Sequence, residues 1–292
     1  MYELNRTLAR RAFKEMLGQA NHFLITILVG LNGVRSGRAG IEKEFHTSWN
    51  PQSVPRSADR SREFVLDLAL VRAIDAFDTY MMTTVRKPCA LSESDFLTKM
   101  NATGQSVARR LEVFDERLAP LPRYQKAALS VAIDWRNRRV HSLSTPSLDK
   151  RTARLLLGNS KTFSSEYSGL KIEEFVSHFK AGSPPTFKEA ASIIRMVHEA
   201  VEHYDQYLLR HVPIESYLKT ALLQFLSAGV SSPANGIHKT WNSPKKERKV
   251  KRLLRMVGVN ETEQATGRKV PDDFVQQLTT LQSNEVLEFL QV

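Results

Sequence analysis

The chain has 292 residues, of which 41% are hydrophobic and 25% are charged, and its formal net charge is +11. This is the composition of an ordinary globular protein with enough apolar residues for a core, so neither metal nor disulfides are needed to hold the fold. The single cysteine, Cys89, excludes an intramolecular disulfide framework and a cysteine-rich zinc site, and we interpret it as a small buried side chain. The positive charge favours a polyanionic partner such as nucleic acid.

The N-terminal region is predicted to be an amphipathic helix over residues 4–31, with a bend near Gly18 or Asn21. No small-residue cleavage site follows it, so it does not resemble a secretion signal. Its most apolar run, residues 23–31, is shorter than the roughly twenty residues that a helix needs to cross a bilayer. We therefore expect a cytoplasmic protein that does not act at a membrane.

Glycine and proline mark residues 33–59 as a long loop, and loops of this length usually have a function. Within it, His46 and Trp49 either stack on a nucleic-acid base or anchor the loop. A helix over residues 60–86 follows and is stopped by Lys87-Pro88, because proline disfavours helix in the residue before it.

Three carboxylates, Asp67, Asp75 and Asp78, interrupt the apolar spacing of this helix. Buried carboxylates need partners. Either Arg136 or His141 from another helix supplies the partner, or the contact is intrahelical, as between Arg72 and Asp75.

The rest of the chain also has helical spacing, and we find no run of alternating strand residues and no internal repeat. Thr186 and Glu189 form a predicted capping box at the start of a helix that ends before Pro213. The other helices are expected over residues 91–100, 106–118, 123–141, 150–157, 172–181, 214–226, 244–257 and 271–290. The polar segments after residue 157 and over 228–241 are interpreted as a loop and a linker.

The predicted fold class is therefore all-α, with a helical bundle domain over residues 1–227 and a basic helical extension over residues 228–292. The extension carries a dense run of cations on an amphipathic helix. We expect RNA binding from Lys245, Lys246, Arg248 and Lys249, although a solvated helix face fits the pattern equally well.

The chemically informative segment is Asp134-Trp135-Arg136-Asn137-Arg138-Arg139-Val140-His141. Trp135 belongs to an apolar stripe that should face the core. Asn137 and His141, four residues apart, are neighbours on another face of the helix, and the long Arg136 side chain can reach the same place.

These residue types suit a scissile phosphate. Arginine binds phosphate oxygens with two N–H groups and stays charged, and histidine can take a proton from a ribose 2′-hydroxyl or give one to a leaving oxygen. Asparagine can hold the imidazole or the ribose in place by hydrogen bonds. Arg138 and Arg139 add positive charge where an RNA backbone would lie. Such a mechanism requires no metal and no cofactor.

The run Arg136-Asn137 followed by His141 resembles the signature of the HEPN ribonucleases, in which arginine and a polar residue precede histidine by four to six residues. The segment 45–51 and the segment Arg60-Ser61-Arg62-Glu63-Phe64 are also similar to bacterial members. The resemblance implies a HEPN-like helical bundle that forms a homodimer with its two motifs facing one another. It also implies metal-independent RNA cleavage by 2′-hydroxyl attack.

Many members of that family are toxins or phage-defence proteins, so the resemblance also suggests an antitoxin or another defence protein as a partner. Two other classes stay open: a catalytically silent helical RNA- or protein-binding module, and a helical scaffold subunit. Metal-free RNA cleavage distinguishes the enzyme from both, and salt-sensitive RNA binding without cleavage indicates the silent module.

His198 and His203 suggest a zinc site, with Glu199 and Glu202 between them. Two histidines must be four residues apart on a helix to face one metal, whereas these are five apart. We therefore interpret His198 and Glu202 as a surface contact and expect no metal.

Overall fold

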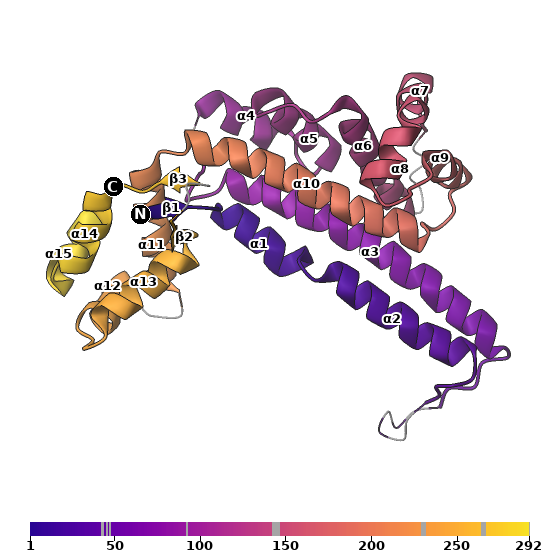
Figure 1. The fold of residues 1–292 in the computed structure, drawn as a ribbon, viewed down its shortest axis with the longest axis horizontal. Helices are drawn as coiled ribbons and strands as arrows, with labels where there is room; N and C mark the ends of the chain where they lie inside the picture. The colour runs from indigo at the N-terminus through magenta and orange to yellow at the C-terminus, as the bar shows by residue number, and fades with distance from the viewer. Residues whose placement is uncertain are drawn as a thin grey trace. The chain divides into compact units, whose positions relative to one another are not determined.

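The computed structural model describes residues 1–41, 44, 46, 48–91, 93–141, 147–228, 232–263 and 267–291. These residues are mostly helical, which confirms the all-α class (Figure 1). The helices are α1 (Leu8–Leu17), α2 (Ala20–Arg35), α3 (Val54–Thr84), α4 (Ser94–Ala102), α5 (Val107–Arg117), α6 (Arg123–Val140), α7 (Lys150–Gly158), α8 (Ser160–Glu166), α9 (Ile172–Ala181), α10 (Phe187–His211), α11 (Ile214–Ser227), α12 (Pro233–Trp241), α13 (Lys246–Met256), α14 (Asp272–Thr280) and α15 (Ser283–Leu290).

The chain divides into two compact units, and each is built from several segments. The first contains Met1–Phe13, Asp78–Pro120 and Val201–Val292, and the second contains Lys14–Phe77 and Leu121–Ala200. Residues 228–292 thus fall in the same unit as α11 and the N-terminal segment, while the motif helix α6 falls in the second unit. The domain boundary after residue 227 stays a prediction.

In the second unit α2 and α3 lie side by side (Figure 1). Leu24 and Leu28, four residues apart on α2, are buried against Leu66 of α3 and Ala190 of α10. The predicted bend is confirmed: α1 ends at Leu17 and α2 begins at Ala20. A side chain at Gly18 would collide with the Lys14 carbonyl oxygen, 2.5 Å from its Cβ position, so this turn requires glycine.

The long loop is shorter than predicted, because α3 begins at Val54 rather than at residue 60. Pro55 then stands in the first turn of α3. Proline is favoured there, since the N–H that it lacks would have no partner inside the helix. The sequence interpretation treated this proline as a loop residue and was wrong.

The expectation of no strands was also wrong. Tyr2–Leu4 (β1) pairs antiparallel with Val259–Glu261 (β2) and with Arg268–Lys269 (β3), so residue 4 begins no helix. Strands of two or three residues are too short to show an alternating pattern, and their partners lie more than 250 positions away. Nothing local in the sequence marks them.

Three predictions of secondary structure need correction. Residues 233–241, expected to be a linker, form α12, whose N-cap Ser232 accepts a hydrogen bond from the Asn235 N–H and whose Ile237 and Trp241 are buried. The expected loop after residue 157 contains α8, which buries Phe163. Residues 271–290 form two helices, α14 and α15, instead of one.

The capping box at the start of α10 is confirmed. The Thr186 N–H donates to Glu189 Oε2 at 2.6 Å, and the Glu189 N–H donates to Thr186 Oγ1 at 3.3 Å. His178 Nδ1 lies 2.8 Å from the other oxygen of Glu189, so this carboxylate also fixes the end of α9.

The start of α1 depends on a fully buried carboxylate. Asp205 of α10 accepts hydrogen bonds from Thr7 Oγ1 at 2.5 Å and from the Thr7 N–H at 3.2 Å. Burial raises the pKa of Asp205 to about 6, although the Thr7 hydrogen bonds and Arg10 oppose the shift. The folded protein therefore favours the protonated acid.

This burial predicts an unusual dependence of stability on pH. Because the folded pKa exceeds the unfolded one, Asp205 should lower the free energy of unfolding as pH rises from about 4 to about 6, by up to about 3 kcal/mol. Asp205→Asn keeps an acceptor for Thr7 but carries no charge, so its stability should not show this fall. Urea unfolding of both proteins at pH 4.5, 5.5 and 7.5 tests this. Parallel stability curves would contradict it.

By length and composition alone, the helical stretch Leu8–Arg35 could cross a membrane, and 17% of its most apolar part is buried inside the protein. A core helix of a soluble protein or a signal sequence can have the same length and composition. The cytoplasmic location therefore stays a prediction.

Candidate functional site

The motif helix α6 is largely buried. Its buried residues are Gln125, Ala127, Ala128, Leu129, Val131, Ala132, Ile133 and Trp135. As predicted, Trp135 faces the core: its ring packs edge-on against Phe175 at 5.3 Å and Phe179 at 6.1 Å between ring centroids, and its Nε1 donates to the Ser183 carbonyl oxygen at 2.9 Å. The tryptophan thereby attaches the last turns of α6 to α9.

One polar stripe runs along α6. Ser130, Asp134 and Asn137 are partly buried, and His141 is exposed just beyond the end of the helix. Their spacings of four, three and four residues place them on one face. This stripe is where α6 meets solvent beside the motif.

Arg136 is held in a fixed orientation. Its Nη2 lies 2.5 Å from Asp75 Oδ1 of α3, and its Nη1 donates to Asn137 Oδ1 at 3.2 Å. The Nε of the same guanidinium is buried and has no hydrogen-bond partner among the described residues. The guanidinium, the Asn137 amide and the Asp75 carboxylate therefore form one cluster, with Asp75 still partly open to solvent.

The carboxylates of α3 find partners on other helices. Asp75 binds Arg136, Asp67 binds Arg139 through two hydrogen bonds of 2.6 and 2.8 Å, and Asp78 binds Arg110 of α5 at 2.5 Å. Arg72 donates to the Met16 carbonyl oxygen instead of to Asp75. The expected partner Arg136 is therefore confirmed for Asp75 alone, because Asp67 and Asp78 pair with other arginines, Arg139 and Arg110. Asp75 thereby joins the motif.

Arg138 is also engaged within the protein. It donates to the Phe179 and Lys180 carbonyl oxygens at the end of α9, at 3.0 and 3.4 Å. Its guanidinium lies 2.6 Å from where a Cβ at Gly182 would be, and Gly182 has φ +69°, so the contact depends on glycine. RNA binding by Arg138 and Arg139 stays a prediction, and their contacts give both a role in anchoring α6.

His141 follows the last residue of α6. Its N–H closes the final turn on the Asn137 carbonyl oxygen at 2.8 Å, and its own backbone is extended. The residue is exposed, so its imidazole is accessible to a ligand. The structure therefore brings Arg136, Asn137 and His141 together at one helix end.

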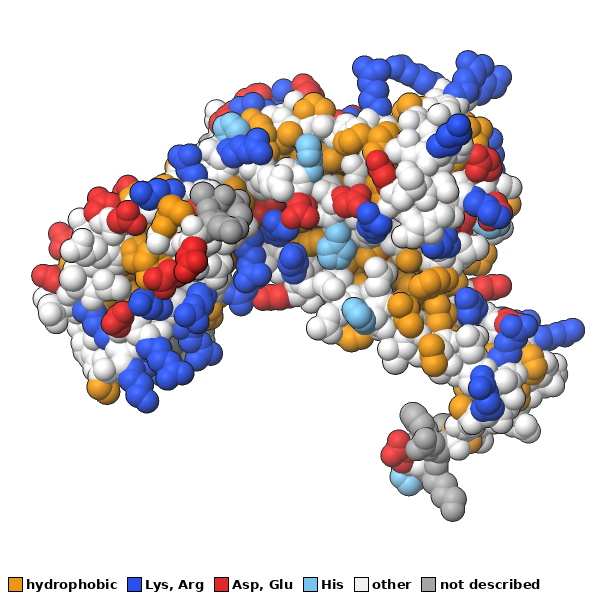
Figure 2. Space-filling view, viewed as in Figure 1, with side chains coloured by type: hydrophobic (Ala, Val, Ile, Leu, Met, Phe, Trp, Pro, Cys, Tyr) orange, Lys and Arg blue, Asp and Glu red, His pale blue; other side chains and the backbone are white. Residues whose placement is uncertain are grey.

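The cations of the C-terminal basic run fall into two groups, those that bind backbone carbonyl oxygens and those that are exposed. Lys246 donates to the Thr280 and Leu281 carbonyl oxygens and Lys249 to that of Lys239, so each satisfies carbonyls at a helix end. Lys245 and Arg248 are exposed. Lys and Arg side chains gather over the region of α12 and α13 (Figure 2).

The remaining candidates have no catalytic geometry. His203 Nε2 lies 3.0 Å from the Ala119 carbonyl oxygen, and no group of three or more potential metal ligands occurs in the described residues. Cys89 is partly rather than fully buried, and burial raises the pKa of its thiol. His46 and Trp49 are exposed, and residues 45 and 47 of the second family-like segment lie outside the described residues.

Exposed apolar side chains gather on the hairpin of α2 and α3. They include Phe23 (61% exposed) and Val29 (64%) on α2, and Phe64 (62%) and Leu68 (49%) on α3. Hydrophobic side chains are visible over α2 in Figure 2. Leu68 directly follows Asp67, the partner of Arg139, and the exposed Val140 precedes His141. An apolar surface of this kind usually marks an interface.

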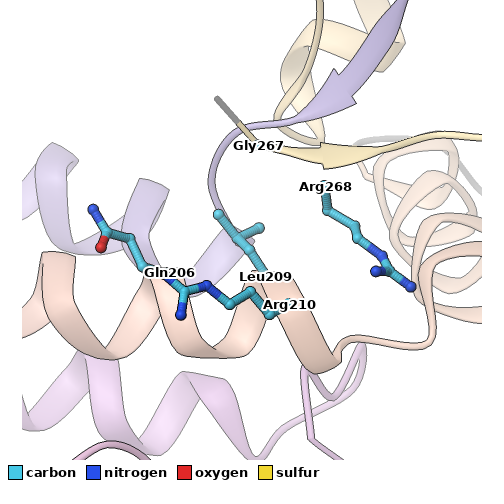
Figure 3. Close-up of a pocket in the computed structure, with 5 residues that line it drawn as sticks. All are labelled: Gln206, Leu209, Arg210, Gly267 and Arg268. Carbon is cyan, nitrogen blue, oxygen red and sulfur yellow. The ribbon is translucent and has the colours of Figure 1, made fainter. Parts of the chain in front are cut away.

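A cavity of about 370 Å³ in the first unit is lined by Gln206, Leu209, Arg210, Gly267 and Arg268. Its two arginines suggest an anion site. Their side chains extend in different directions, however: Arg210 extends toward Gln206, and Arg268 extends away from Gln206 and Arg210 (Figure 3). They form no joint cradle for an anion.

Comparison with protein-family models, with curated proteins and with solved structures gives no match. The interpretation of the site therefore depends on the residues themselves.

Proposed function

We propose that this protein is a metal-independent endoribonuclease that cleaves RNA by attack of a ribose 2′-hydroxyl on the adjacent phosphate. The observation that carries the proposal is the cluster at the end of α6, where Asp75 and Asn137 orient the Arg136 guanidinium and His141 is exposed one turn later. A guanidinium, an amide and an imidazole supply charge stabilisation, orientation and proton transfer.

In this reaction, one imidazole takes the proton of the 2′-hydroxyl while the 2′-oxygen bonds to phosphorus. The bond from phosphorus to the 5′-oxygen breaks, and that oxygen receives a proton from an imidazolium. Arg136 stabilises the negative charge on the phosphate oxygens, and Asn137 orients the ribose or the imidazole. The products are a 2′,3′-cyclic phosphate and a 5′-hydroxyl.

Two proton transfers on opposite sides of a phosphate are best served by two imidazoles, but each chain contributes one His141. A twofold dimer supplies the second without further sequence. The exposed apolar side chains of α2 and α3 near the motif, above all Phe64 and Leu68, provide a surface for such a dimer. The family resemblance also supports it.

The basic face of α13 would support RNA binding without taking part in chemistry. Lys245 and Arg248 are exposed and suited to phosphate contacts, whereas Lys246 and Lys249 already bind carbonyl oxygens. A role as a toxin or phage-defence effector, with an antitoxin or another defence protein as partner, follows from the resemblance alone.

Incubation with single-stranded RNA in EDTA tests the activity. The purified protein should cut the RNA, and end-group analysis should find 2′,3′-cyclic phosphates and 5′-hydroxyls. Strict dependence on Mg²⁺, or 3′-hydroxyl products, would exclude this mechanism.

The second candidate is a catalytically silent RNA- or protein-binding module. The ion pair between Arg136 and Asp75 favours it, because a paired arginine also serves a purely structural purpose. Salt-sensitive RNA binding with no cleavage under any condition would support this candidate.

A further inference from the structure

Asp134 lies just before the Arg136-Asn137 motif. It has no role in the proposed reaction or in the packing of α6. It lies on the polar stripe, one turn before Asn137 and two turns before His141. Its chain neighbours Ile133 and Trp135 are both buried, and Asp134 itself is partly buried. Its carboxylate is therefore partly withdrawn from water and next to the proposed phosphate site.

The cation best placed to pair with Asp134 is turned elsewhere. Arg138 follows four residues later on the same helix, a spacing at which acid and arginine commonly pair. Its guanidinium instead donates to the Phe179 and Lys180 carbonyl oxygens. The described residues give the Asp134 side chain no hydrogen bond and no ion pair. A partly buried carboxylate without a donor costs free energy, so the position calls for an explanation beyond packing.

A carboxylate accepts hydrogen bonds and repels phosphate, so Asp134 cannot contact the RNA phosphates favourably. The donors that it can bind in RNA are the ribose 2′-hydroxyls, which are the same in every nucleotide, and the N–H groups on base edges, which differ between bases. Guanine offers two adjacent donors, N1–H and the N2 amino group, that match the two oxygens of a carboxylate. Adenine and cytosine offer one amino group each on the corresponding edge, and uracil offers a single N–H.

We propose that Asp134 is a specificity-determining residue that binds the Watson–Crick edge of a guanine next to the scissile phosphate. The inference rests on the proposed function, because the phosphate is assigned to Arg136 and His141. With the phosphate at the end of α6, the stripe leads from Asn137 to Asp134 and gives the neighbouring base a place on the same helix face. Sequence-specific RNA recognition commonly uses unpaired bases in this way.

A binding experiment tests the inference independently of cleavage. RNA pentamers with one central guanosine, inosine or adenosine among uridines are made fully 2′-O-methylated, which blocks attack by the 2′-oxygen. Fluorescence anisotropy gives their Kd. Inosine lacks only the N2 amino group, so the wild-type protein should bind the guanosine pentamer about tenfold more tightly than the other two.

Asp134→Asn keeps the shape of the side chain but replaces one acceptor by a donor, and it should reduce the preference for guanosine to within about twofold. Glu63→Gln, which removes one exposed carboxylate of α3, is the matched control and should keep the preference. Unchanged circular dichroism verifies that the Asp134 variant folds. Equal affinities for the three pentamers in the wild type, or an undiminished preference in Asp134→Asn, would overturn the assignment.

Mapping of cleavage sites on unmodified RNA separates the two proposals. Cleavage beside guanosine that becomes unselective in Asp134→Asn supports both. Unselective cleavage by the wild type overturns the role of Asp134 and leaves the ribonuclease intact. Selective binding of the guanosine pentamer without any cleavage overturns the ribonuclease and supports the binding role.

Discussion

His141→Ala is expected to lower the rate of RNA cleavage by about 10²–10⁴-fold, the range that general acid–base catalysis contributes. His141 is exposed beyond the last turn of α6, so its loss should leave the free energy of unfolding nearly unchanged. Cleavage of a fluorescent RNA in EDTA measures the rate. The control is His22→Ala, which removes another exposed histidine in the same unit. Equal rates for His141→Ala and the wild type would remove the histidine from the mechanism.

Arg136→Ala is expected to lower the rate by about 10²–10³-fold, as does the loss of a donor to a developing oxyanion. The same change leaves Asp75 without its cation, so a stability effect must be separated from a catalytic one. Two variants do this. Arg136→Lys keeps a charge for Asp75 but loses the two-armed guanidinium, and Arg136→Ala with Asp75→Asn leaves no unpaired charge. Both should fold, and both should stay slow. Recovery of the rate in the double variant would make Arg136 a structural residue.

A further large effect on the cleavage rate is expected from substitutions at the surface of α3. Phe64→Asp and Leu68→Asp replace exposed apolar side chains near the motif by charges that a dimer interface would have to desolvate. Each should convert a dimer into a monomer and lower the cleavage rate at least about 10²-fold, because the second His141 leaves the site. Multi-angle light scattering and the RNA assay measure the two effects on the same sample.

Leu157→Asp is the matched control for this surface. Leu157 is also an exposed apolar residue (41%), but it lies on α7. Its replacement should leave both mass and rate unchanged. A wild-type protein that is monomeric and cuts RNA would contradict the shared site, and so would dimers of undiminished activity in Phe64→Asp.

The sequence alone determined which segments are helical where the apolar spacing repeats over several turns. It also determined the grouping of Arg136, Asn137 and His141, because residues within about one and a half helical turns stay close whatever the rest of the chain does. The capping box of Thr186 and Glu189 was likewise predictable, since both partners lie within one turn. Such local features can be predicted without knowing which distant residues they contact.

Only the tertiary structure decided what surrounds the motif. Asp75 and Arg136 are 61 positions apart, and the sequence left an intrahelical contact equally open. The short strands β1, β2 and β3 pair across most of the chain, and α12 depends on the burial of Ile237 and Trp241. Arg138 donates hydrogen bonds to carbonyl oxygens of α9, so it does not form the ion pair with Asp134 that their spacing of four residues would allow. Contacts of this kind depend on where helices meet, which local spacing does not encode.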